Sequence, residues 1–148
     1  MSSTQPQVPR LKDQICFRLY AASRLITRLY QPLLEPLGLT YPQYIVLMIL
    51  WEQSPQRVSD IGQLAMLNSN TLTPLLKRLE EQGFILRQRD QQDERVVMIS
   101  LTAQGQHLQE SCRMIPQVLL NHSHLDASEL ILLRQQLDQL LAVLSKAE

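Results

Sequence analysis

Cys16 is the side chain of this sequence whose surroundings best suit redox chemistry. It lies in the segment ICFRLYAASR near the expected start of a helix, with Arg18 close by and Tyr20 one turn later. A thiol becomes a nucleophile when a helix N-terminus, a cation or hydrogen-bond donors stabilise its thiolate. The phenols of Tyr20, Tyr30 and Tyr41 are suitable donors, although the sequence does not bring the last two near Cys16. A cysteine beside an apolar stripe is also a common inert packing residue, so these residues alone leave both interpretations open.

A second group of polar side chains lies on one face of a helix expected to start within residues 68–70 and to end before Gly83. Leucines between residues 72 and 79 recur at the spacing of one buried helix face. The opposite face carries Asn70, Thr73 and Lys77, flanked by Thr71 and Arg78. Amides, hydroxyls and cations on an exposed face are suited to base edges and phosphates. Each of these residues taken singly is equally consistent with a solvated helix surface.

A β-hairpin, the wing, is expected directly after this helix. Its strands are predicted at residues 84–89 and 96–101, and a polar loop, QQDE, joins them. The hairpin carries cations at Arg87, Arg89 and Arg95, yet residues 72–95 contain five cations and five anions. Asp93 is therefore notable, because it could hold the Arg95 guanidinium ready for a narrow minor groove, where arginine is favoured. A solvated surface ion pair is the alternative.

The helices that must position these groups follow from apolar periodicity and from cap residues. A helix from about Leu11 should end near Tyr30, because Pro32 disfavours helical geometry in the residue before it. A short helix over residues 32–37 is closed by Gly38. The helix that begins at Thr40-Tyr41-Pro42 is apolar almost all round, so it should be central.

Three further helices complete the expected order of elements. Ser59 and Asp60 should cap a short helix before the polar-faced one, and Thr102 should cap a helix over residues 103–115. Asp126 should cap a last helix with a wide leucine face. Two short helices, a turn and a hairpin make a winged helix-turn-helix, and the protein as a whole should be mainly α. The leucine-rich helices at both ends have more apolar surface than the lobe needs for its own core, which favours dimerisation.

Composition limits the possible classes of function. The chain has 148 residues, four glycines, a net charge of zero and a pI of about 6.8, so no global basic charge marks it as a nucleic-acid binder. We expect a cytoplasmic protein without membrane contact, because the sequence contains neither a signal peptide nor an apolar run of spanning length. His122 and His124 lack companion ligands, so no metal site is expected, and no cofactor or enzyme motif is present.

The segment LTPLLKRLEEQGFILRQRDQQDERVVMISLT resembles the recognition helix and wing of MarR-type transcription regulators, whose wing ends in a similar D-x-R motif. The resemblance implies a single MarR-type domain over residues 1–148 that binds a palindromic operator in double-stranded DNA as a homodimer. Residues 1–9 would be a flexible arm, 10–38 and 103–148 would form the dimer interface, and 40–101 would be the winged lobe. The DNA contacts that the resemblance implies are Ser69, Asn70, Thr71, Thr73, Lys77, Asp93 and Arg95. Two nearby cations, Arg78 and Arg87, are added to these expected contacts.

The segments CFRLYAASR, RLYQPLL and LTYPQY are together similar to the organic-hydroperoxide-sensing (OhrR) branch of that family. This similarity implies that Cys16 is the peroxide-reactive residue and that Tyr30 and Tyr41 of the partner subunit donate hydrogen bonds to it. Tyr20, one turn after Cys16, is a further candidate donor. The expected protein is a repressor that releases its operator when an organic or lipid hydroperoxide oxidises Cys16, with a low-molecular-weight thiol adduct as the expected final product. The alternative is a MarR-type repressor controlled by a non-covalent phenolic ligand. Cys112 lies earlier than the resolving position expected near Asn121, so we interpret it as structural.

Overall fold

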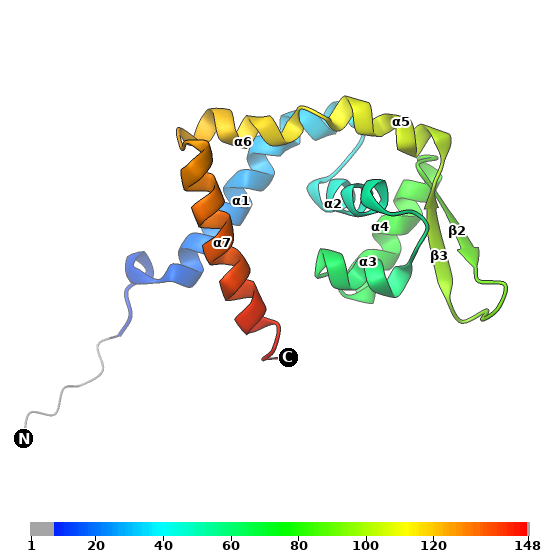
Figure 1. Ribbon diagram of the computed structural model, residues 1–148, viewed down its shortest axis with the longest axis horizontal. Helices are drawn as coiled ribbons and strands as arrows, with labels where there is room; N and C mark the ends of the chain where they lie inside the picture. The colour runs from blue at the N-terminus through cyan, green and yellow to red at the C-terminus, as the bar shows by residue number, and fades with distance from the viewer. Residues whose placement is uncertain (1–7, 148) are drawn as a thin grey trace, which may run out of the picture. The chain divides into compact units, whose positions relative to one another are not determined.

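Helices account for most of the residues that the computed structural model describes, which are residues 8–147 (Figure 1). The α-helices are α1 (Ile15–Leu34), α2 (Tyr41–Glu52), α3 (Val58–Ala65), α4 (Ser69–Glu81), α5 (Ala103–Cys112), α6 (Ile115–Ser123) and α7 (Ala127–Leu144). The strands are β1 (Gln56–Arg57), β2 (Ile85–Arg89) and β3 (Val97–Leu101), and two short 3-10 helices cover Leu11–Asp13 and Glu35–Leu37. Contacts between elements divide the chain after Cys112 into two units.

The core of the first unit forms around α2, as the apolar character of this helix predicts. Thr40 caps α2 in a capping box, in which its side chain accepts from the Gln43 backbone N–H and the Gln43 side chain accepts from the Thr40 N–H. Val46 and Leu47 have no exposed surface. The other fully buried side chains come from α1, α2, α3, α4 and the wing strands, namely Leu34, Leu50, Ile61, Leu72, Leu76, Leu79, Ile85 and Ile99. Burial of these apolar groups holds α3 and α4 against α2.

The helix α4 is sharply two-faced, and it begins within the expected residues 68–70. Asn68 is the cap, because its Oδ1 accepts from the Thr71 N–H at 3.0 Å, and the first helical residue is Ser69. Pro74 lies inside the helix, where its only cost is one missing donor on an exposed turn. Gly83, with a φ of 81°, turns the chain into β2 as expected.

The wing is confirmed as an antiparallel pair of β2 and β3, with Arg87 opposite Ile99. The sequence did not reveal β1, which pairs antiparallel with β3 and places Arg57 opposite Met98. The sheet therefore has three strands in the order β1-β3-β2. A strand of two residues has no alternation of apolar and polar side chains, so periodicity cannot detect it. On β3, Ile99 is fully buried, whereas Val97 and Leu101 are half-buried.

The predicted end of the first helix was wrong. A 3-10 turn precedes α1, and α1 continues past Tyr30 and through Pro32 to Leu34. Pro32 removes only the donor to the Arg28 carbonyl, and both residues are exposed, so water can replace that hydrogen bond. The expected αL residue, Gly38, follows the second 3-10 helix with a φ of 71°.

Two other boundaries were also wrong. Arg57, not Ser59 or Asp60, occupies the cap position of α3, so both predicted cap residues lie in its first turn. The helix after the wing ends at Cys112 rather than near residue 115, and Pro116 falls in the first turn of α6, where a missing N–H costs nothing. Thr102 accepts from the Gly105 N–H at 3.0 Å, which confirms it as the cap of α5.

The second unit contains α6 and α7. Asp126 caps α7 as predicted, because it accepts from the Glu129 N–H at 2.9 Å while Glu129 accepts from the Asp126 N–H at 2.8 Å. No side chain of α7 is buried. Most of the predicted N-terminal arm, residues 1–7, lies outside the described residues.

No single helix in the described part of the chain is long and apolar enough to cross a membrane. One pair of consecutive helical segments is long and apolar enough when its members are taken together, but the pair is bent by 74°; the two segments are Ile15–Leu37 and Tyr41–Glu52. Core helices pass the same test, and much of α2 is buried.

Candidate DNA-binding surface and redox site

The exposed face of α4 carries every side chain that the sequence assigned to it. The leucines at positions 72, 75, 76 and 79 are all buried, and this fixes the rotation of the helix on the lobe. The opposite face is therefore held outward. Its exposed residues are Ser69, Asn70, Thr71, Thr73, Lys77 and Arg78. This face offers amides, hydroxyls and cations on a rigid helix, which are the groups that DNA recognition uses.

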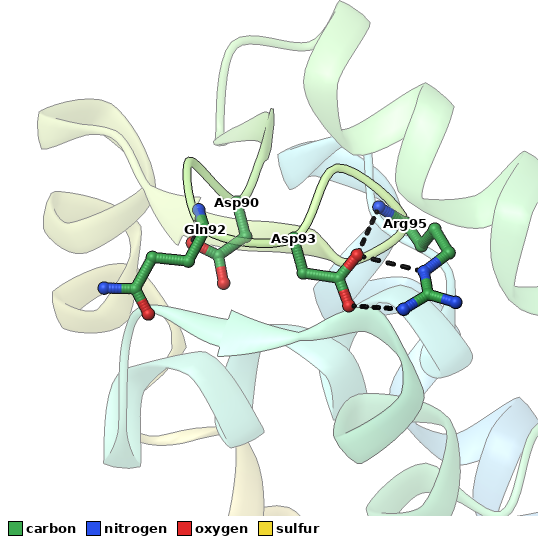
Figure 2. Close-up of polar contacts among 4 residues, drawn as sticks. All are labelled: Asp90, Gln92, Asp93 and Arg95. Carbon is green, nitrogen blue, oxygen red and sulfur yellow. Dashed lines mark hydrogen bonds and ion pairs between the residues drawn. The ribbon is translucent and has the colours of Figure 1, made fainter.

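The tip of the wing holds the predicted pair of Asp93 and Arg95 (Figure 2). Arg95 donates its backbone N–H and its Nε–H to Asp93 Oδ1, both at 3.1 Å, and Nη2 donates to Oδ2 at 3.3 Å. These hydrogen bonds from Arg95 lower the pKa of the Asp93 carboxyl below its usual value. The Arg95 side chain nevertheless remains 91% exposed. The guanidinium is thus oriented by its neighbour and still available to a ligand.

Arg87 joins the base of the wing to α4. Its Nε donates to Glu80 Oε2 at 2.9 Å, and its backbone N–H donates to Glu80 Oε1 at 3.2 Å. The side-chain hydrogen bond from Arg87 is the main reason that the pKa of Glu80 is lowered. The sequence did not predict this pair, because the two residues belong to different elements. It ties the helix and the wing into one surface.

Cys16 is exposed near the start of α1, as expected. Within the part of the chain that the structure describes, its thiol has no hydrogen-bond partner. Tyr20 lies one turn further along, packed against Phe17 with ring centroids 6.3 Å apart. The Arg24 guanidinium lies 5.5 Å from the Tyr20 ring centroid. The Cys16 environment in one chain is therefore open and incomplete.

Tyr30 and Tyr41 lie side by side, as they must if both are to donate hydrogen bonds to one cysteine thiolate. Their ring centroids are 5.3 Å apart, although one residue is on α1 and the other begins α2. Tyr44, which the sequence interpretation missed, packs against both, at 6.5 Å from Tyr30 and 6.3 Å from Tyr41. Its spacing of three residues from Tyr41 was the signal that could have revealed it. Burial raises the pKa of all three phenols, that of Tyr44 to about 12, so they remain O–H donors at neutral pH.

Cys16 cannot reach these tyrosines within its own chain. Cys16 and Tyr30 belong to the same straight helix and are separated by 14 residues, or about 21 Å at ~1.5 Å per residue. The structure therefore brings the tyrosines together but leaves the thiol apart from them.

Cys112 differs from Cys16 in both exposure and chemistry. Its side chain is 2% exposed, and burial raises the pKa of its thiol. A buried, protonated thiol is a poor nucleophile, which supports the interpretation of Cys112 as structural. His107, His122 and His124 belong to no group of three or more potential metal ligands among residues 8–147.

A helix-turn-helix with an outward polar face, followed by a wing with a held arginine, defines a winged helix-turn-helix DNA-binding protein. A family described as transcriptional regulator SarA/Rot matches residues 28–112. The organic hydroperoxide resistance transcriptional regulator of Bacillus subtilis is 46% identical over 135 residues, which cover 91% of this chain and 92% of the relative. The chain belongs to the MarR/SarA family of transcriptional regulators, which bind DNA and are not enzymes.

Solved structures of AbfR, a protein of Staphylococcus epidermidis, have the same fold. Reduced AbfR bound to DNA is 42% identical to this chain, with a TM-score of 0.76, and the match covers 91% of this chain and 94% of AbfR. The disulfide-formed AbfR, also 42% identical, gives a TM-score of 0.61 over 89% of this chain and 93% of AbfR.

Proposed function

We propose that this protein is a homodimeric repressor that leaves its palindromic operator when organic hydroperoxides oxidise Cys16. The observation that carries the proposal is the separation of the exposed Cys16 thiol, which has no hydrogen-bond partner among the described residues, from the pair of Tyr30, which is buried, and Tyr41, which is half-buried, on the same chain. Each half is incomplete, and a second copy can bring its Tyr30 and Tyr41 to the first copy's Cys16. The names of the relatives support this interpretation, since one is an organic hydroperoxide resistance regulator and another was solved in reduced and disulfide forms.

Exposed apolar surface supports the homodimer. On α1, Ile15 is 65% exposed and Leu25 is 61% exposed. On α7 the exposed apolar side chains are Ile131, Leu132, Leu133, Leu140, Leu141, Val143 and Leu144. Covering such surface stabilises an assembly by roughly 25 cal/mol per Å². A second copy is the occupant we propose, because the redox site also requires it, and the segments 10–38 and 103–148 would then supply the interface.

The proposed reaction is a two-electron oxidation of sulfur. The Cys16 thiolate attacks one oxygen of the hydroperoxide, the O–O bond breaks, and the products are a sulfenic acid and an alcohol, whose oxygen takes up a proton. A low-molecular-weight thiol can then condense with the sulfenic acid, releasing water and leaving a mixed disulfide. The phenols of Tyr30 and Tyr41, with Tyr20, would donate hydrogen bonds to the reduced thiolate, and a larger oxidised group would disturb those contacts.

DNA binding would use both surfaces described above. In a two-fold dimer, two α4 helices reach half-sites about one helical turn apart. Residues on the polar face of α4 would read base edges and contact phosphates, Arg87 would contact a phosphate, and Arg95, oriented by Asp93, would enter the minor groove. A change in the spacing of the two lobes on oxidation would weaken binding, and a difference of about 3–5 kcal/mol would make the switch nearly complete. We place this regulator in the cytoplasm, with the DNA that it binds.

A gel-shift with the DNA upstream of the chain's own gene tests the proposal. Wild type should release this DNA after treatment with cumene hydroperoxide, whereas Cys16→Ser should stay bound. Cys112→Ser is the matched control and should respond as wild type does. Release of Cys16→Ser by peroxide would refute the redox proposal. A cross-linked dimer on a non-reducing gel that disappears in Cys112→Ser would show instead that Cys112 resolves the sulfenic acid.

One observation favours the alternative of a non-covalent phenolic ligand. A pocket of about 460 Å³ lies between α1 and α2, with Tyr41, Thr27 and Gln31 among its lining residues. Its apolar wall and few polar groups suit a small aromatic molecule. A phenol that released Cys16→Ser from DNA in the absence of peroxide would favour this second function.

A further inference from the structure

A pocket of about 350 Å³ lies where the base of the wing meets α3 and α4. Its polar lining consists of Arg57, Ser59, Thr73, Arg87 and Arg95, which come from β1, α3, α4 and the wing. Three of these residues, Thr73, Arg87 and Arg95, are already expected to contact DNA. The pocket therefore opens on the surface that a duplex would cover. Arg57 and Ser59 were not among the predicted contacts.

The three guanidiniums of this pocket differ in their partners. Glu80 accepts hydrogen bonds from Arg87, and Asp93 accepts hydrogen bonds from Arg95. Among the residues that the structure describes, Arg57 has no carboxylate within ion-pair distance, although its charge helps to lower the pKa of the Asp93 carboxyl from further away. Arg57 is therefore the guanidinium of this pocket whose hydrogen-bond donors are not engaged by a carboxylate, and they are available to a phosphate.

The backbone of Arg57 is held firmly while its side chain is exposed. Arg57 pairs with Met98 across β1 and β3. The preceding residue, Gln56, is 9% exposed, and its Nε2 donates to the Ile49 carbonyl at 3.2 Å and to the Gln53 carbonyl at 2.8 Å. These contacts anchor β1 to the end of α2. The guanidinium thus projects from a fixed point of the lobe rather than from the loop of the wing.

We propose that Arg57, assisted by the hydroxyls of Ser59 and Thr73, binds a backbone phosphate of duplex DNA. A phosphate there would lie between α4 and the wing and would fix the lobe against one strand. Because every nucleotide carries the same phosphate, this contact contributes affinity and register but no base preference. The inference rests on the DNA binding of the proposed function and does not involve the redox step.

The test compares wild type with Arg57→Met and with Arg57→Lys, which serves as the control that keeps the charge. Methionine keeps much of the aliphatic stem but removes the charge, whereas lysine keeps the charge but not the planar fork. Dissociation constants are measured for the operator and for an unrelated duplex of equal length, each at several salt concentrations. Thermal unfolding checks that each variant is folded.

Arg57→Met should weaken binding to both duplexes by the same factor, about tenfold or more. Its log–log salt slope should fall by about 0.9 per protomer, or about 1.8 per dimer. Arg57→Lys should retain the wild-type slope. A loss confined to the operator, an unchanged slope in Arg57→Met or an equal fall of the slope in Arg57→Lys would each overturn the assignment.

The experiments separate the phosphate contact of Arg57 from the redox role of Cys16. Peroxide should lower the DNA affinity of Arg57→Met by the same factor as that of wild type, since Arg57 is not part of the redox site. If peroxide instead released Cys16→Ser, the redox proposal would fail while the salt slopes would still decide the role of Arg57.

Discussion

At the scale of single residues, an acidic side chain on a DNA-facing surface needs a physical reason. Asp93 would repel phosphates, yet it accepts three hydrogen bonds from Arg95. An arginine side chain has about 2 kcal/mol of rotamer entropy to lose on binding. The hydrogen bonds to Asp93 restrict this freedom before DNA binds, so less entropy would be lost on binding. We therefore propose that Asp93 favours DNA binding by orienting Arg95 rather than by touching DNA.

Asp93→Asn should lower operator affinity even though it removes a negative charge from the surface. Loss of the bidentate ion pair frees Arg95, and we expect binding to weaken by about three- to tenfold. Fluorescence anisotropy with labelled operator measures this change. Arg95→Ala should weaken binding more, and addition of Asp93→Asn to Arg95→Ala should have no further cost. Tighter binding by Asp93→Asn would contradict the orienting role.

The same pair predicts how the effect depends on pH. The pKa of Asp93 is lowered, so the ion pair is present above the ordinary carboxyl pKa of about 4 and is lost as the pH falls through the lowered value. The affinity ratio of wild type to Asp93→Asn should therefore stay constant between pH 6 and pH 8. A ratio that changed across this range would assign the effect to another group.

At the scale of elements, α2 and α5 meet the base of the wing at one junction. The Trp51 Nε1–H donates to the Gly105 carbonyl at 2.9 Å, and the Thr102 hydroxyl donates to the Gly83 carbonyl at 2.6 Å. Tyr41 stands at the other end of α2, against Tyr30. One rigid helix thus joins the tyrosine cluster to the wing. A shift at the tyrosines can reach the DNA-binding surface through α2.

Gly105 makes this junction possible because it has no side chain. A Cβ at this position would collide with the Phe84 backbone carbonyl, and backbone cannot move aside as a flexible side chain can. Gly105→Ala should therefore force α5 away from β2 and lower the free energy of unfolding by about 1–3 kcal/mol or more. Urea denaturation followed by Trp51 fluorescence measures the change. Ser111→Ala on the exposed face of α5 is the control, and equal stability of the two variants would refute the collision.

At the scale of the whole molecule, the redox site is a property of the proposed dimer. A separation of about 21 Å along α1 divides the thiol from the phenols, at ~1.5 Å per residue. A contact between two copies can close that distance without unfolding the helix. In the proposed mechanism, the lobe carries its DNA-binding groups within one chain, whereas peroxide control requires two chains. The proposal therefore couples peroxide sensing to dimerisation.

A mixed dimer tests this coupling. One chain carries Cys16→Ser, and the other carries Tyr30→Phe with Tyr41→Phe. If the tyrosines act on the partner's thiol, the heterodimer contains one complete site, and its single Cys16 should react with hydroperoxide nearly as fast as in wild type. The homodimer of the double phenylalanine variant should react at least several-fold more slowly. Equal, slow rates for both would show that the tyrosines do not act across the interface.

The sequence by itself determined the parts of this protein that depend on local pattern. Leucine spacing set the buried face of α4, and thereby the exposed face. Cap residues at Thr40, Thr102 and Asp126 marked helix starts, because capping needs only a few neighbouring residues. The fold class followed from these patterns, and the MarR-type family from the resemblance of the recognition helix and wing, with its D-x-R motif, to that family; the comparisons confirmed both.

The tertiary structure decided what depends on contacts between distant segments. It added β1, whose two residues carry no periodic signal, and so placed Arg57 beside the wing. It paired Arg87 with Glu80 and added Tyr44 to the tyrosine cluster. It also carried α1 through Pro32, because an exposed carbonyl can bond to water instead. Local pattern fixes which face of an element is buried, but only packing fixes which other element that face meets.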